Sequence, residues 1–346
     1  MPVVSTEIPD PRHNPELLAH DQAERILLDA WNSGRMPHAW LIGGVPGIGK
    51  ATLAFRFARF LLSQGEEAGG LFGDPPPATS LRIGPEHPVF TRVASGGHAD
   101  LLTIERPFDD KKGRLKMDIP VDQVRRIAPF LRLTAAEGGW RVVVLDGAER
   151  LNMNGQNAIL KILEEPPARS LFLIVNHMPG RLLPTIRSRC RVLRLGELQA
   201  SEIASRLRRD VPDASDDEIA QASAQAMGSM RTGFQNLIGG GGEVNAQVQR
   251  LFALTTPDWA GIQALADAVS AKGREASYGL MVRELFQALA AESEKALAGG
   301  DLRAAERLAA FWQSEDARWR EGEAYNLDRK QMLLTFFTGL SAARND

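Results

Sequence analysis

The segment from Gly44 to Ala51 has the residues best suited to bind phosphate. It reads Gly-Val-Pro-Gly-Ile-Gly-Lys-Ala, follows an apolar run and precedes a helical pattern, which is the setting of a phosphate-binding loop (P-loop). Glycines let backbone N–H groups turn toward phosphate oxygens, and a helix N-terminus adds partial positive charge. We therefore predict that Gly44, Gly47, Gly49 and Lys50 bind nucleotide phosphates. The alternative is a structural turn that merely retains these glycines.

Position 51 weakens the prediction of ordinary Mg²⁺–ATP binding. The residue after the P-loop lysine is normally Ser or Thr, whose hydroxyl binds Mg²⁺, but here it is Ala51. Thr52 follows about 100° further around the helix, and we expect its hydroxyl to point elsewhere. ATP and Mg²⁺ stay possible ligands of an impaired site.

Asp146 ends the apolar run Arg141–Asp146. An aspartate at the end of a buried strand holds Mg²⁺ in P-loop enzymes. The next residue, Gly147, has no side chain to polarise water, and Glu149 is a poor substitute three positions after Asp146. Asp146 either retains a metal-binding role without its base or only caps the strand. Because position 51 has likewise lost the hydroxyl that binds Mg²⁺, we favour the interpretation in which Asp146 retains a metal-binding role without its base.

Arg189 lies in the stretch Ser188-Arg189-Cys190, after a predicted helix. A lone arginine is usually a solvated surface charge. An arginine at this place could instead reach a phosphate bound to a neighbouring subunit and stabilise the transition state there.

Five short apolar runs predict the strands that would position these residues. They lie at 39–43, 101–105, 141–146, 171–176 and 191–195, and most are continuous, as in parallel strands buried on both faces. Helical patterns at 50–62, 121–131 and 154–163 alternate with several of them. This alternation predicts a doubly wound α/β domain over residues 1–197, interrupted by an insertion or long loop at 64–98. Residues 108–118 indicate an exposed turn.

The rest of the chain reads as helical. Residues 198–238 predict a small helical lid, residues 239–243 a glycine linker, and residues 244–346 an all-helical domain.

Composition narrows the function classes. The net charge is −2, so contact with nucleic acid must come from local patches. Cys190 is the only cysteine, which excludes an intramolecular disulfide and a cysteine-type zinc site. No apolar run reaches the ~20 residues that cross a bilayer, and the first 15 residues do not resemble a signal peptide. We expect a cytoplasmic protein.

Several segments together resemble the clamp-loader branch of the AAA+ ATPases, particularly subunits of the bacterial DNA polymerase III clamp loader. The resemblance spans nearly the whole chain and rests on the segments at 121–125, 157–167, 184–190 and 325–328. It implies an α/β P-loop AAA+ core with a five-stranded parallel sheet, a small helical lid and an all-α collar domain that oligomerises.

The departures from the family pattern distinguish among its subunits. The motor subunits (gamma/tau) keep Lys-Ser/Thr and Asp-Glu where this chain has Lys50-Ala51 and Asp146-Gly147. The delta subunit generally lacks the Ser-Arg-Cys box. The resemblance therefore implies a non-catalytic stator without its own ATPase activity, in which Arg189 is an arginine finger acting in trans.

Many such subunits also carry a four-cysteine zinc module after the P-loop helix. Residues 64–98 occupy that place without any cysteine, and His87 and His98 alone are too few ligands. We expect no bound zinc or other metal there.

The resemblance also assigns nucleotide sensors. Asn176 or His177 falls at the sensor 1 position, and Arg231 at the sensor 2 position of the lid. With the local site impaired, each could equally be a packing or surface residue.

The implied partners are the gamma/tau and delta subunits, the sliding clamp, and primed DNA through the complex. Candidates for contact with DNA phosphates are Arg125, Arg126, Asn154 and Gln156, with weaker candidates at Lys111, Lys112 and Arg114. An ordinary solvated face is an equal alternative. Two other functions stay open: a self-sufficient ATPase motor that uses Thr52 or water to hold Mg²⁺, and a DNA-binding adaptor outside any clamp loader.

Overall fold

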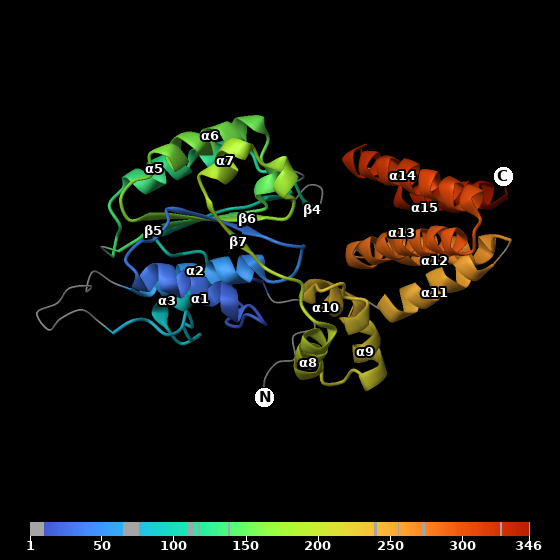
Figure 1. The fold of residues 1–346 in the computed structure, drawn as a ribbon, viewed down its shortest axis with the longest axis horizontal. Coiled ribbons are helices and arrows are strands. Elements are labelled where there is room, and N and C mark those ends of the chain that lie inside the picture. The colour runs from blue at the N-terminus through green and yellow to red at the C-terminus, as the bar shows by residue number, and fades with distance from the viewer. Residues whose placement is uncertain are drawn as a thin grey trace, which may run out of the picture.

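The chain forms an α/β core, a group of three short helices and a bundle of long helices (Figure 1). The computed structural model describes residues 10–64, 76–109, 114–116, 118–137, 139–238, 241–254, 256–271, 274–325 and 327–345. The predictions for Lys111 and Lys112 fall outside these ranges.

The core contains a five-stranded sheet with the order β2-β5-β6-β1-β7, in which all neighbours are parallel. Its strands are β1 (Ala39–Gly43), β2 (Leu101–Ile104), β5 (Arg141–Asp146), β6 (Ser170–Asn176) and β7 (Arg191–Arg194). The continuous apolar runs are the strands because both faces of the sheet are covered. The predicted five-stranded parallel sheet is thus confirmed.

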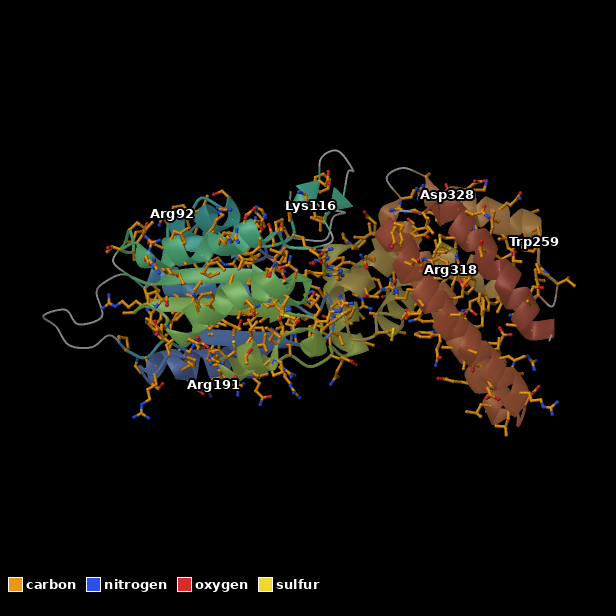
Figure 2. The ribbon with its side chains drawn as sticks, turned by 90° about the horizontal axis from the view of Figure 1, so that it is seen from above. Arg92, Lys116, Arg191, Trp259, Arg318 and Asp328 are labelled. Atoms are coloured by element: carbon orange, nitrogen blue, oxygen red, sulfur yellow. The ribbon has the colours of Figure 1, made fainter. Side chains whose placement is uncertain are left out.

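Helices cover the two faces of this sheet (Figure 1). Val142 and Val144 of β5 pack in the core cluster with helix α2, whereas Val143 and Leu145 pack in the cluster on the other face. One layer holds α1 (Asp21–Asn32), α2 (Lys50–Ser63) and α3 (Pro88–Ala94). The other holds α4 (Val121–Arg125), α5 (Ile127–Arg132), α6 (Met153–Glu164) and α7 (Pro184–Ser188). Figure 2 shows Arg92 of α3 and Arg191 of β7 on opposite sides of the core.

Short connecting elements follow several strands. The 3₁₀ helices are η1 (Ala148–Arg150) and η2 (Pro179–Arg181), and strands β3 (Phe108–Asp109) and β4 (Arg114–Leu115) form an antiparallel hairpin. This hairpin falls within the predicted exposed turn at 108–118, and Phe108 and Leu115 on it are exposed.

Apolar packing joins the segment at 76–98 to helix α2. Leu81 and Val93 are fully buried in the cluster that includes α2, and the guanidinium of Arg59 lies 4.5 Å from the centre of the Phe90 ring. Asn32 exchanges two hydrogen bonds with the backbone of Ala78, each of 2.9 Å. A hydrophobic contact surface therefore orders this part of the predicted insertion.

The three short helices are α8 (Ala200–Asp210), α9 (Asp216–Ala224) and α10 (Met230–Ile238). Helices α8 and α9 each begin with a capping box, which satisfies the free N–H groups of the first turn. Ile203, Leu207 and Phe234 form the centre of a separate small apolar cluster.

The long-helix bundle consists of α11 (Gly241–Ala253), α12 (Trp259–Ser270), α13 (Glu275–Ala298), α14 (Leu302–Tyr325) and α15 (Arg329–Asn345). Phe336 is fully buried and contacts the rings of Phe286, Phe311 and Trp319 at centroid distances of 5.5–6.0 Å. Helix α11 begins at Gly241, so the last three residues of the predicted linker are helical. The packing of Val244 and Val248 in the bundle core offsets the poor helix propensity of glycine. In the described ranges, no helix is long and apolar enough to cross a membrane.

Candidate functional site

The P-loop joins β1 to α2 at the carboxyl end of the sheet. Gly47 and Gly49 have φ angles of +80° and +109°, which L side chains rarely adopt. The Lys50 ammonium is buried and donates to the carbonyls of Gly44 at 2.6 Å and Val45 at 2.5 Å. An ammonium has three N–H donors, so one remains for a ligand inside the loop.

A cavity of about 660 Å³ opens in front of this loop. The lining comes from the N-terminal segment, the P-loop, the ends of β2 and β5, and the lid helix α10. Polar residues that line it include Arg12, Lys50, Thr52, Arg106, Asp146, Glu149, Arg150, His177 and Arg231. This volume is in the range of small-molecule sites.

Burial dominates the electrostatics at the cavity. It lowers the pKa of Lys50 to about 8, although Asp146 and Glu149 favour the charged ammonium. Burial also raises the pKa of Asp146 to about 6, with a further contribution from Glu105. His177 has its pKa lowered to about 4, by burial first and then by the charge of Lys50. For both Lys50 and Asp146, burial therefore disfavours the charged form more than the opposite charge of the other residue favours it.

The lid contacts the P-loop directly. The backbone N–H of Arg231 donates to the carbonyl of Gly47 at 3.1 Å, and a Cβ on Gly47 would collide with Ser229 Oγ and with Arg231 Cβ. Arg231 is exposed and lines the cavity; its assignment as a nucleotide sensor stays a prediction.

The two sensor 1 candidates face opposite sides of the sheet. His177 lines the P-loop cavity, and its backbone N–H donates to Glu149 at 3.0 Å. Asn176 lines a second cavity of about 540 Å³ beneath α7 and β7, and its side chain accepts from Met178 N at 3.2 Å. The assignment of Asn176 to nucleotide stays a prediction.

Two arginines of α2 hold the N-terminal segment across the cavity. Arg59 donates to the carbonyls of Arg12 and Asn14, each at 2.8 Å, and Arg56 donates to the carbonyl of Pro15 at 2.7 Å. Arg12 forms an ion pair with Glu105 at the end of β2. The segment thus links the P-loop helix to the edge of the sheet.

Sequence reasoning missed Arg12, Arg106 and Arg150 as residues of this cavity. Arg106 and Arg150 follow strands β2 and β5, and residues after the carboxyl ends of parallel strands meet at one edge of the sheet. That rule could have placed both Arg106 and Arg150 at the cavity. No sequence pattern connects Arg12 with the cavity.

The residues present do not fit the Mg²⁺ ion that P-loop enzymes use. Ala51 has no hydroxyl, and Gly147 has no carboxylate and adopts a φ of +78°. Glu149 is buried and accepts from the His177 N–H, and the half-buried Asp146 has a raised pKa. Thr52 lines the cavity but lies one helix position past the usual hydroxyl. Asp146, whose ionised form is disfavoured, is then the one carboxylate left at the usual metal position. It is a poor donor set for a metal that demands octahedral oxygen ligands.

Arg189 lies at the C-terminus of α7, away from the P-loop cavity. It is about one-third exposed; its Nη1 donates to the Thr185 carbonyl at 3.0 Å, and its Nη2 lies 2.7 Å from Glu164 Oε1. The guanidinium is accessible on the surface of the core, as a role in trans requires.

The DNA-contact candidates divide by burial. Arg126 and Asn154 are exposed, and Arg125 is exposed with a 3.2 Å ion pair to Asp122. Gln156 is buried and donates to the carbonyls of Leu151 and Arg181 while accepting from Leu183 N. Its amide therefore joins α6 to the segment before α7 and does not face solvent.

The predicted histidines of the insertion have local roles. Nδ1 of His87 accepts from Val89 N at the start of α3, and Nδ1 of His98 accepts from Asp100 N, both at 3.2 Å. Among the described residues, no group of three His, Cys, Asp or Glu side chains is placed to hold a metal ion.

These features define the class of protein. A P-loop follows β1, β6 separates β1 from the Asp146 strand, and a helical lid contacts the loop. This is the fold of a P-loop core of the AAA+ type, with a changed Mg²⁺ site.

Comparison with known proteins identifies the family. The model of the family described as DNA polymerase III, delta subunit matches residues 19–199, and the chain belongs to this family. It is 40% identical over 153 residues to DNA polymerase III subunit delta′ of Pseudomonas aeruginosa, covering 44% of this chain and 41% of that protein. It is 34% identical over 166 residues to the subunit of the same name from Escherichia coli K12, covering 48% and 44%. The chain thus spans less than half the length of these relatives.

Among solved structures, a DNA polymerase III gamma-subunit-related protein from Thermotoga maritima is similar at 14% identity, with a TM-score of 0.42. The match covers 92% of this chain and 98% of that one.

Proposed function

We propose that this chain is a delta′-type subunit of a DNA polymerase III clamp loader, in which it is a stator rather than a motor. The observation that carries the proposal is the pairing of an impaired Mg²⁺ site with an accessible arginine finger. Ala51 and Gly147 remove groups needed for hydrolysis, whereas Arg189 keeps a side chain that is about one-third exposed at the surface. Family membership over residues 19–199 supports the same role.

In this role Arg189 acts at the ATP site of an adjacent gamma/tau subunit. ATP hydrolysis develops negative charge on the γ-phosphate oxygens, and a guanidinium from the next subunit stabilises that charge. Arg189 must exchange its contact with Glu164 for the phosphate. Because the pair is partly exposed, this exchange costs little, about 1 kcal/mol or less.

Contacts between the core and the lid support a stator in which these two parts move together. The lid is hydrogen-bonded to the P-loop through Arg231 and Gly47, and Glu16 of the N-terminal segment forms ion pairs with Arg206 and Arg209 of α8. We propose that residues 1–197 are the AAA+ core, 198–238 its lid and 244–346 the collar that joins the other subunits. The delta subunit, the sliding clamp and primed DNA complete the proposed cytoplasmic assembly.

Reconstitution tests this function. The purified chain is mixed with gamma and delta subunits, and the complex is isolated by gel filtration and assayed for ATP hydrolysis with clamp and primed DNA. We expect a complex whose ATPase activity depends on this chain, and no turnover by the chain alone. Steady hydrolysis by the chain alone that disappears in Lys50→Ala would instead indicate a motor, and failure to form a complex would favour an adaptor outside the clamp loader.

A further inference from the structure

Three guanidinium groups converge on the P-loop cavity from separate elements. Arg106 follows β2, Arg150 ends η1, and Arg231 belongs to α10; all three line the cavity. Within the described ranges, none of the three side chains has a hydrogen bond or ion pair. Burial, and then the charge of Arg150, lower the pKa of Arg106; the carboxylates of Glu149 and Asp146 oppose this shift without cancelling it, and Arg231 adds to it. Grouping positive charges is unfavourable unless negative charge lies among them, and a bound anion would add to the negative charge of Asp146 and Glu149 in the same lining.

We propose that the P-loop cavity binds a nucleoside di- or triphosphate without Mg²⁺, with Arg106 and Arg150 supplying the positive charge that the metal supplies elsewhere. The inference deepens the proposed function by naming the ligand of its own P-loop. The arginine finger acts at a different nucleotide site, so the two proposals can fail separately.

A count of charges supports a metal-free site. Two ion pairs in the lining, Arg12–Glu105 and Arg206–Glu16, are internally neutral. The remaining lining groups are the cations Lys50, Arg106, Arg150 and Arg231 against the carboxylates Asp10, Asp146 and Glu149. An ordinary P-loop has one lysine and a divalent ion for the same phosphates. Here the three arginines line the same cavity as Lys50, and guanidinium groups can make charge-assisted, bidentate hydrogen bonds to phosphate.

The P-loop itself retains the geometry for phosphate. Its glycines keep left-handed φ angles at Gly47 and Gly49, and the two carbonyl contacts of Lys50 leave one N–H donor. The backbone at the start of α2 adds N–H groups and partial positive charge. The residues lost from the site, at positions 51 and 147, are those that serve the metal and the attacking water, not those that hold phosphate.

The rest of the cavity suits the nucleobase of a nucleotide. Leu18, Leu198, Met230 and Phe234 line it and belong to, or pack against, the apolar cluster of the lid. The site therefore has an apolar end formed by the lid and a cationic end at the P-loop, which is the distribution that a nucleotide presents.

Calorimetric titration of the full chain with ADP, ATP and inorganic tripolyphosphate, in MgCl₂ or in EDTA, tests the proposal. We expect binding in EDTA with a dissociation constant within about threefold of that in MgCl₂, whereas a metal-dependent site loses more than about tenfold, or 1.4 kcal/mol. Arg106→Gln should raise the dissociation constant in EDTA about tenfold, since it removes charge-assisted hydrogen bonds. Arg132→Gln, an exposed arginine at the end of α5, is the matched control and should leave it unchanged.

Three outcomes would overturn the proposal. One is the absence of binding in either condition. Another is binding that requires MgCl₂ and disappears in Thr52→Val, which would assign the metal to the Thr52 hydroxyl. The third is an unchanged affinity in Arg106→Gln when the thermal unfolding of that variant, measured without ligand, matches the parent chain. Because the chain is titrated alone, none of these results bears on Arg189.

Discussion

Arg189 and Glu164 form an ion pair between the end of α7 and the end of α6, with 2.7 Å between Nη2 and Oε1. The proposed arginine finger thus has a partner on its own subunit. The side chains are 34% and 47% exposed, so water competes for both groups and the pair is weak. Glu164 holds the guanidinium at the surface without sequestering it.

Replacing Arg189 by Ala should lower the ATPase activity of the reconstituted complex without preventing its assembly. Arginine fingers contribute about 10³–10⁵ in rate at a single site, and other sites in the complex would retain their own fingers. The measurement is steady-state ATP hydrolysis with clamp and primed DNA, after gel filtration has shown that the complex forms. Arg187→Ala is the matched control, because Arg187 is an exposed arginine of the same short helix. Equal rates for the two variants would refute the finger assignment.

Glu164→Gln should leave the ATPase rate of the complex unchanged or raise it by up to about fivefold. The substitution removes an attraction of about 1 kcal/mol or less that Arg189 must give up to reach a phosphate. Glu165→Gln provides a control at the adjacent exposed position. A large decrease seen only in Glu164→Gln would mean that Glu164 orients the finger during hydrolysis.

Asp146→Asn should stabilise the chain at neutral pH. In the folded protein the pKa of Asp146 is raised from 3.8 to about 6, so the folded state holds more protons than the unfolded state between these values. The free energy of unfolding therefore falls as pH rises through this window, and the full cost of the ionised carboxylate, about 3 kcal/mol at most, is present above pH 6.

Urea unfolding of Asp146→Asn and the parent chain at several pH values measures this effect. The gain in the variant should be greatest near about pH 7 and should shrink as pH approaches 4. His177, with its pKa lowered to about 4, has the opposite pH dependence but is present in both proteins. A variant that is less stable than the parent at neutral pH would show that the Asp146 carboxylate is favourably paired.

Gly47→Ala should separate the lid from the P-loop. The new methyl group would collide with Ser229 Oγ and Arg231 Cβ, and it would also adopt an unfavourable φ of +80°. Gly34→Ala has a similar φ of +67° but open space around the position, so it measures the backbone strain alone, about 1–2 kcal/mol.

The Gly47 variant should therefore lose more stability than the Gly34 variant, and amide hydrogen exchange should increase in α8 and α10. Equal losses in the two variants, with unchanged exchange in the lid, would show that the contact between Gly47 and the lid is not stabilising.

The sequence by itself predicted the elements whose pattern is local. Apolar runs identified all five strands of the parallel sheet. The runs are continuous in β1, β5 and β6, because these strands are buried on both faces. The glycine pattern of the P-loop and the changes at positions 51 and 147 were visible as residue types at fixed spacings. The helical character of residues 241–243 was not predicted, because packing in the bundle overrides the weak propensity of glycine.

Only the tertiary structure decided which side chains share the cavity. Alternate residues of a strand face opposite sides of the sheet, so the position at which β6 ends places His177 in the P-loop cavity and Asn176 beneath α7. Arg12 reaches Glu105 across 93 residues of sequence, and Gln156 is buried by contacts with the segment before α7. Residue type and spacing carry no information about such contacts, because they form only when separate elements pack against one another.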